Sequence, residues 1–233
     1  QAETLATDAL KHEGGQDDVP DLLKALAPPD DGLVKYLDFE GDPEICEQGF
    51  RGHALLVKGI SDGLEIKRPV QDDFTISVSF RPDADGLGSG APRWFLGAGL
   101  VDGEISGIVD DFGLSWFKGG RVTAGVGRPE CFLHSPPGLE LGKWHHAALT
   151  RKRSTGRIQL WVNGELVDED IGGQQALISP EVLTVGRMHP GGNPFNGAID
   201  EVRIYDRVLS PQEILSLQES SGYGVRARQL VAQ

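Results

Sequence analysis

An aspartate on an otherwise apolar strand face is the residue of this sequence with the clearest chemical significance. Alternation with a period of two predicts a strand over residues 199–205, in which Glu201 and Arg203 face outward. Asp200 shares the opposite face with Ala198, Val202 and Ile204. An ionised carboxylate on a buried face is costly unless it is paired, hydrogen-bonded or bound to a metal. We therefore expect a partner for Asp200, either a metal ion or backbone N–H donors.

Paired carboxylates for glycoside hydrolysis are the second kind of candidate. Retaining glycosidases place two carboxyl groups about 5–5.5 Å apart across the scissile bond. The nearest acidic run, residues 168–170, leads directly into Gly172-Gly173, so it is interpreted as a solvated hairpin end. Asp200 and Glu201 are adjacent and point to opposite faces of their strand, so they cannot act together. No pair in the sequence supports catalysis.

The elements that position these residues follow from alternation and turn chemistry. Residues 74–81 alternate apolar and polar side chains, which is typical of a sheet with one covered and one wet face. Asn163-Gly164 is a favoured two-residue hairpin turn, and it follows predicted strands at 144–151 and 157–162. Residues 210–213, Ser-Pro-Gln-Glu, form a capping box with proline at the first helical position, which predicts a short C-terminal helix.

The remaining segments predict an all-β protein. Further strands are expected at 33–40, 94–96, 105–109, 112–117 and 121–126, and an irregular crossing at 129–141. Many short strands with glycine and proline turns predict a two-sheet antiparallel β-sandwich, a jelly roll. We expect three parts: a helical arm or linker at 1–31, the sandwich at 32–220 and a tail at 221–233.

Three motifs in order resemble a known family. They are Gly142-Lys143-Trp144-His145-His146-Ala147, then Leu160-Trp161-Val162-Asn163-Gly164-Glu165, then Phe195-Asn196-Gly197-Ala198-Ile199-Asp200-Glu201-Val202-Arg203-Ile204-Tyr205 followed by Leu209-Ser210. Together they resemble the laminin-G-like branch of the concanavalin A-like lectin/glucanase superfamily. The resemblance implies a concanavalin A-like sandwich. It is weak evidence for any one activity, because the family carries many.

The resemblance also implies a structural calcium ion. Calcium takes about 6–8 oxygen ligands from carboxylates and carbonyls. By resemblance, Glu40 and Asp200 would be side-chain ligands, with the carbonyl of Gly59 close by, so that the ion would tie the first strand to the last. The loop at 42–49 departs from the family's polar, glycine-rich pattern, which weakens the case for loop ligands. The alternative is that Asp200 accepts backbone N–H bonds and binds no metal.

A ligand surface is expected on the wet face of the sheet. Trp161 lies on the strand face opposite Ile158 and Leu160, together with Arg157 and Gln159. Sugar rings stack their C–H faces on aromatic side chains, and polar neighbours can bind their hydroxyls. The alternative is that this tryptophan is an ordinary packing residue.

Composition limits the partners. The chain has 233 residues, with 22 Lys and Arg against 35 Asp and Glu, giving a formal charge of −13. Such a chain repels phosphate backbones and anionic membranes, so nucleic acid is not expected as a partner. No apolar run approaches the roughly 20 residues of a membrane helix. Cys46 and Cys131 match no zinc or redox spacing, which leaves open one disulfide or two buried thiols.

We therefore expect a noncatalytic binding or adhesion module that recognises carbohydrate or protein. It would be part of a larger exported bacterial protein, placed outside the cell or in the periplasm. The chain starts at Gln1 without a signal peptide, as a trimmed export signal or a fragment would. The alternatives are a structural spacer without a ligand, and a divergent glycoside hydrolase or lyase of the same fold.

Overall fold

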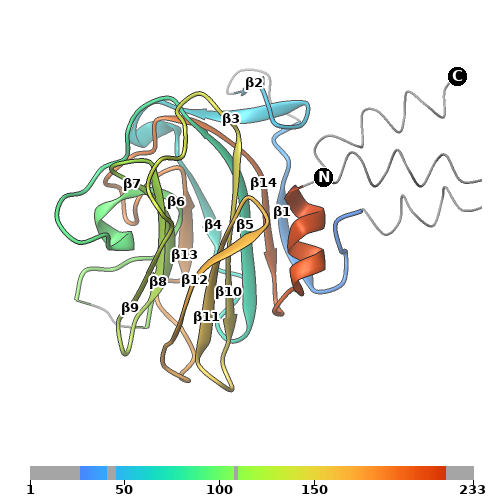
Figure 1. Ribbon diagram of the computed structural model, residues 1–233, viewed down its shortest axis with the longest axis vertical. Helices are drawn as coiled ribbons and strands as arrows, with labels where there is room; N and C mark the ends of the chain where they lie inside the picture. Colours follow the sequence, from blue (N-terminus) through green and yellow to red (C-terminus); the bar gives the residue numbers. More distant parts are fainter. Residues whose placement is uncertain (1–26, 41–45, 108–109, 219–233) are drawn as a thin grey trace, which may run out of the picture.

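Two antiparallel sheets packed face to face form the protein (Figure 1). The structure is a computed structural model, and it describes residues 27–40, 46–107 and 110–218. The expected helical arm at 1–31 lies mostly outside the described residues, and the tail at 221–233 lies wholly outside them. In the described part of the chain, no helix is long and apolar enough to span a membrane.

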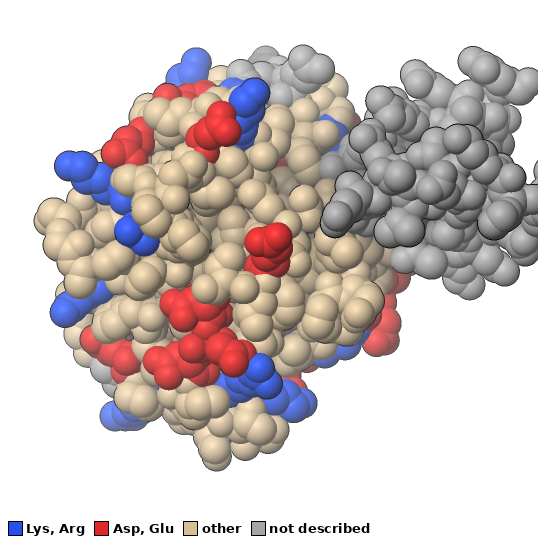
Figure 2. Space-filling view, in the orientation of Figure 1, with Lys and Arg blue, Asp and Glu red and all other residues tan. Residues whose placement is uncertain are grey.

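The larger sheet, sheet A, has eight strands. Seven follow the order β12-β11-β10-β5-β14-β3-β2, and β1 pairs with β14. Their bounds are β1 Leu33–Leu37, β2 Cys46–Gln48, β3 His53–Val57, β5 Phe74–Pro82, β10 His145–Lys152, β11 Arg157–Val162, β12 Glu165–Ile171 and β14 Gly197–Tyr205. The edge strand β12 is largely exposed, and acidic side chains gather over it (Figure 2).

The smaller sheet, sheet B, has six strands in the order β4-β13-β6-β7-β8-β9. Their bounds are β4 Leu64–Lys67, β6 Ala98–Asp102, β7 Phe112–Phe117, β8 Arg121–Val126, β9 Cys131–His134 and β13 Val182–Val185. Two short 3-10 helices, η1 Ile60–Asp62 and η2 Trp94–Leu96, lie outside the sheets. The expected sandwich is therefore confirmed.

The core lies between the sheets, and alternation along the strands builds it. In β5, Ile76, Val78 and Phe80 point into the core, as the sequence predicts. The wet face expected on the other side of this strand is wrong, because Thr75, Ser77 and Ser79 are also buried. The Phe80 ring packs against the rings of Trp116 and Phe195, with centroids 5.7 and 6.1 Å apart. Because Trp116 belongs to sheet B, these aromatic contacts join the two sheets.

A bulge in β14 changes which of its side chains face the core. Its pairing with β5 shifts between Asp200 and Arg203, and Glu201 has a φ of 54°. Ile199 lies in the core before the bulge, and Val202 and Ile204 lie there after it. Asp200 instead pairs with Ser79 on the outer side of sheet A. The single apolar row predicted for positions 198, 200, 202 and 204 is therefore wrong.

A C-terminal helix at 211–218 covers part of the outer face of sheet A (Figure 1). The predicted capping box closes its N-terminus, since the Ser210 N–H donates to Glu213 Oε2 at 2.7 Å and the Glu213 N–H to Ser210 Oγ at 3.3 Å. Helix residues Ile214 and Leu217 pack on the outer side of the sheet. The expected short helix is confirmed.

Three expected elements around sheet B differ in the structure. Residues 94–96 form η2 rather than a strand, and the strand begins at Ala98. Residues 105–107 are not in a strand, and 108–109 lie outside the described residues. The segment expected to be irregular contains β9, in which Cys131 is a buried free thiol. The thiol alternative therefore holds for Cys131.

A fully buried arginine ties β10 to two loops. Arg151 is 0% exposed, and its guanidinium donates to the carbonyls of Asp72, Gly173 and Gln175 at 2.6–2.8 Å. A planar fork of donors satisfies several carbonyls at once, whereas an ammonium group is a point donor. Arg151 therefore links β10 to the segment before β5 and to the loop after β12.

Replacing this side chain should destabilise the fold. We expect Arg151→Lys to lower the free energy of unfolding by about 2–4 kcal/mol, because buried carbonyls lose their donors. Urea unfolding followed by circular dichroism measures the change. Arg153→Lys, at an exposed neighbouring position, is the control and should change stability by less than about 1 kcal/mol. Equal effects of the two substitutions would contradict this role.

Candidate functional site

The structure buries the tryptophan that was expected to bind a ligand. Trp161 is only 6% exposed and packs in a cluster with Ala148, Tyr205, Leu209, Ile214 and Leu217 beneath the C-terminal helix. Arg157 and Gln159 both donate to Glu169, at 3.1 and 3.0 Å. The outer strand face is thus as predicted, but the expected exposure of Trp161 is wrong. In this structure Trp161 is a packing residue.

The three expected calcium ligands fall into two places. Asp200 Oδ2 accepts the Arg51 N–H at 2.8 Å, and Glu40 Oε1 accepts the His53 N–H at 3.1 Å, so both carboxylates meet one short segment. Gly59 follows the far end of β3, where Val57 pairs with Gly197. Strand geometry places Gly59 more than roughly 10 Å from Asp200.

Asp200 is a buried carboxyl that backbone donors hold. The residue is 0% exposed, and burial raises its pKa to about 7, with the charges of Glu201 and Glu40 adding to the rise. No lysine or arginine of the described residues forms an ion pair with this carboxylate. Its oxygens accept the N–H groups of Arg51 and Glu201 instead, as the alternative predicted. No set of three or more metal-ligating side chains occurs in the described ranges, so a cation here would need backbone or water oxygens as well.

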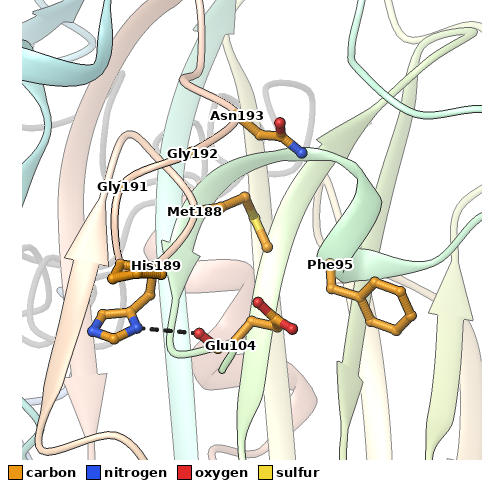
Figure 3. A pocket seen from close by; sticks show the side chains of 8 residues that line it. Phe95, Glu104, Met188, His189, Gly191, Gly192 and Asn193 are labelled. Atoms are coloured by element: carbon orange, nitrogen blue, oxygen red, sulfur yellow. Dashed lines mark hydrogen bonds between the residues drawn. The ribbon is translucent and has the colours of Figure 1, made fainter. Parts of the chain in front are cut away.

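A hollow at the surface beside the other sheet is a second candidate site. It is an open depression of about 520 Å³ beside sheet B. Its walls are Phe95 from η2, Glu104 after β6, and residues 188–193 between β13 and β14 (Figure 3). This volume lies within the roughly 300–1,000 Å³ of small-molecule sites.

Glycines in sheet B position the aromatic wall. A Cβ on Gly113 or Gly125 would stand 2.6 or 2.1 Å from the ring of Trp94. These two residues pair across β7 and β8, so together they provide a flat floor on which the indole lies. The next residue, Phe95, is thereby held at the surface, with its ring centroid 5.8 Å from that of Phe132.

The opposite wall is a closed loop. Met188 and Gly192 exchange backbone hydrogen bonds of 2.9 and 3.1 Å across it. The Arg187 guanidinium donates to Pro190 O at 2.6 Å and pairs with Glu65 at 2.7 Å. The loop is therefore fixed by its own backbone and by one arginine that spans it.

The buried Asp102 side chain links Glu104 to the 188–193 loop. Its Oδ2 accepts the Glu104 N–H at 3.0 Å and the His189 N–H at 2.8 Å, while its Oδ1 has no partner. The residue is 1% exposed, and burial raises its pKa to about 8. The His189 ring adds a second link, with Nδ1 3.1 Å from Glu104 O (Figure 3). One buried carboxyl thus positions both Glu104 and His189.

The hollow is acidic. Burial raises the pKa of Asp111 to about 6, and burial followed by the charge of Asp111 raises the pKa of Glu104. Glu104 is the only carboxylate among the described residues that line the hollow. An aromatic ring, a thioether, an amide and one carboxylate suit the binding of a sugar ring with hydroxyl groups.

Sequence reasoning missed this site. Phe95 was assigned to a strand, and Asp102, Glu104 and His189 were not singled out. The Gly-Arg-Met-His-Pro-Gly-Gly run at 186–192 is the signal that indicates a functional loop, since glycines cluster there between two strands.

Comparison with known proteins bears on both the fold and the site. A laminin G-type family model, described as the concanavalin A-like lectin/glucanases superfamily, matches residues 59–215. The rat "Sushi, von Willebrand factor type A, EGF and pentraxin domain-containing protein 1" is 32% identical over 103 residues. That match covers 36% of this chain and spans only 3% of the rat protein's length.

Two solved structures share the fold. The CBM40 of the Ruminococcus gnavus IT-sialidase, bound to alpha2,3 sialyllactose, has a TM-score of 0.51 and 18% identity, covering 70% of this chain and 97% of that one. Domain 4 of AbnA, a GH43 extracellular arabinanase from Geobacillus stearothermophilus, was solved with arabinotriose. Its TM-score is 0.56 with 18% identity, covering 75% of this chain and 80% of that one.

The raised pKa of Asp102 predicts a pH dependence of stability. A carboxyl whose folded pKa is about 8, above the ordinary 3.8, stabilises the fold fully below about pH 4, and this contribution is lost as the pH rises towards 8. Asp102→Asn mimics the protonated carboxyl and removes this titration. We expect the melting temperature of the wild type to fall between pH 5 and pH 8 by several degrees more than that of the variant, at roughly 2–4 °C per kcal/mol.

Differential scanning calorimetry at the two pH values measures this difference. Asp206→Asn, at an exposed position, is the matched control and should retain the wild-type pH dependence. If the melting temperatures of Asp102→Asn and the wild type fall by the same number of degrees, the pKa of the Asp102 carboxyl is not raised by burial.

Proposed function

We propose that this chain, which belongs to the concanavalin A-like lectin/glucanase superfamily, is a noncatalytic carbohydrate-binding module. The family resemblance inferred from the motifs is confirmed by the match over residues 59–215. The observation that carries the proposal is the hollow of about 520 Å³ between Phe95, Glu104 and the 188–193 loop. The R. gnavus module and the arabinanase domain, which share the fold, were solved with sialyllactose and arabinotriose, and this supports a glycan ligand.

The shape of the site favours a carbohydrate over a protein. The sequence left both ligand classes open. Stable protein interfaces bury about 800 Å² of each partner and need a broad surface. The described hollow is instead of small-molecule size and combines one partly buried ring with hydrogen-bonding groups. A spacer without a ligand has no use for such a site.

The carboxylates do not favour hydrolysis. A glycosidase needs two carboxyl groups that reach the bond from either side. Glu104 lines the hollow, whereas Asp102 is buried beneath its walls and bonded to their backbone. The acidic run at 168–170 lies on the edge strand β12, away from the hollow. Binding without turnover is the activity that this arrangement supports.

We further propose that the module works within a longer exported protein, outside the cell or in the periplasm. The chain matches only 3% of the length of its rat relative, which supports one module among many. The formal charge of −13 also suits a protein that stays soluble at a surface.

A structural calcium ion is the last part of the proposal. Glu40 and Asp200 would hold it, together with backbone or water oxygens, and Gly59 is too distant to take part. The ion would supply the positive partner that buried Asp200 lacks among the described side chains. Its role would be to stabilise the junction of β14 with the segment before β3.

Removing the Phe95 ring should weaken glycan binding. On a glycan array and by isothermal titration, we expect Phe95→Ala to weaken affinity at least tenfold, about 1.4 kcal/mol, because the sugar loses its stacking surface. Leu96→Ala, at the exposed next position of η2, is the control and should bind as the wild type does. Unchanged binding by a folded Phe95→Ala protein would place the ligand elsewhere.

Chelation tests the metal. If Glu40 and Asp200 hold calcium, excess EDTA should lower the melting temperature by several degrees, and calcium should restore it. Asp200→Asn and Glu40→Gln should make the melting curve indifferent to both additions, whereas Asp206→Asn should not. A wild-type curve that ignores EDTA contradicts the site and leaves the backbone N–H bonds as the explanation of Asp200.

A further inference from the structure

One carboxylate lines the proposed glycan site, and a second carboxyl group lies beside it. Glu104 reaches into the hollow, and Asp111 lies close enough for its charge to raise the pKa of Glu104. Asp111 Oδ2 accepts the N–H of Ile105, the residue after Glu104, at 3.2 Å. A ligand that carries a carboxylate or a sulfate into this place would meet like charge at short range.

Two arginines lie close to the hollow without lining it. Arg187 donates to Pro190 O, pairs with Glu65 and leaves only 10% of its side chain exposed. Arg93 lies over the rings of Phe95 and Phe132, at 6.0 and 5.3 Å from their centroids, rather than among the residues that line the hollow. No lysine or arginine of the described chain lines it.

The groups that do line the hollow match uncharged hydroxyls. Met188 and Glu104 point into the space between the loop and Phe95 (Figure 3). An ionised carboxylate only accepts hydrogen bonds, so Glu104 can accept hydrogen bonds from two hydroxyl groups of one ring. Asn193 offers both a donor and an acceptor, and the Phe95 ring offers an apolar surface for the C–H face.

We propose that this hollow selects uncharged glycans and excludes sialylated, uronic-acid and sulfated ones. The inference rests on the proposed carbohydrate-binding function and names its ligand class. Glu104 is the residue that sets the selectivity, because it binds hydroxyls and repels anions from one position.

Matched pairs of glycans that differ only in charge test this selectivity. Suitable pairs are lactose with sialyllactose, and methyl-esterified galacturonan oligomers with their de-esterified forms, printed on one array beside neutral arabinan, mannan and glucan oligomers. We expect the wild type to bind one or more neutral members at least tenfold more tightly than any acidic counterpart. Raising the salt concentration should narrow the difference, because it screens the repulsion.

Glu104→Gln separates charge from shape. The amide keeps the size of the side chain and one acceptor, so we expect neutral binding to fall only a few-fold while acidic binding rises. The ratio of neutral to acidic affinity should therefore shrink at least fivefold. Glu165→Gln, which changes an exposed acid on β12 outside the hollow, is the matched control and should leave the ratio unchanged.

The outcomes distinguish the two proposals. Acidic glycans that bind as tightly as their neutral counterparts, with binding lost in Phe95→Ala, would overturn the selectivity and leave the binding function standing. A ratio unchanged by Glu104→Gln would also overturn it. No binding to any neutral or acidic glycan would overturn the binding function itself.

Discussion

Each sheet of this sandwich depends on a buried aspartate that is held by backbone N–H groups and that forms no ion pair with a lysine or arginine among the described residues. Asp102 accepts bonds from Glu104 and His189 on sheet B, and Asp200 accepts bonds from Arg51 and Glu201 on sheet A. A buried carboxyl is costly, so each one must either keep its proton or gather donors around it. Segments far apart in the sequence are brought together at these two points because the carboxyls require them.

The two aspartates hold different parts of the structure in place. Asp102 lies at the end of β6, where it accepts the N–H of His189 and so anchors a loop that belongs to neither sheet. Asp200 lies where the neighbours of β14 change from β3 to β1, and the bulge at Glu201 separates the two pairings. Beside it, Glu201 accepts the Tyr36 hydroxyl at 2.7 Å and so joins β14 to β1.

The features that depend only on neighbouring residues could be predicted from the sequence. Alternation in β5, the Asn163-Gly164 turn and the Ser210–Glu213 capping box are all confirmed, because each depends on neighbours in the chain. The phase of β14 could not be predicted, since a glutamate gives no sign that it will adopt a positive φ. The burial of Trp161 depends on where the C-terminal helix packs, and the hollow joins Asp102 to a loop 87 residues away. Such long-range packing cannot be seen in the periodicity of the sequence.

The edge strand β12 also determines how copies of the module behave beside one another. An uncovered edge strand is a template on which a second sheet can extend, and it is a common origin of aggregates. Here that edge carries Glu165, Asp168, Glu169 and Asp170, so an approaching identical edge would bring carboxylates against carboxylates. Two copies of the module would therefore be unfavourably placed to pair through this edge of sheet A.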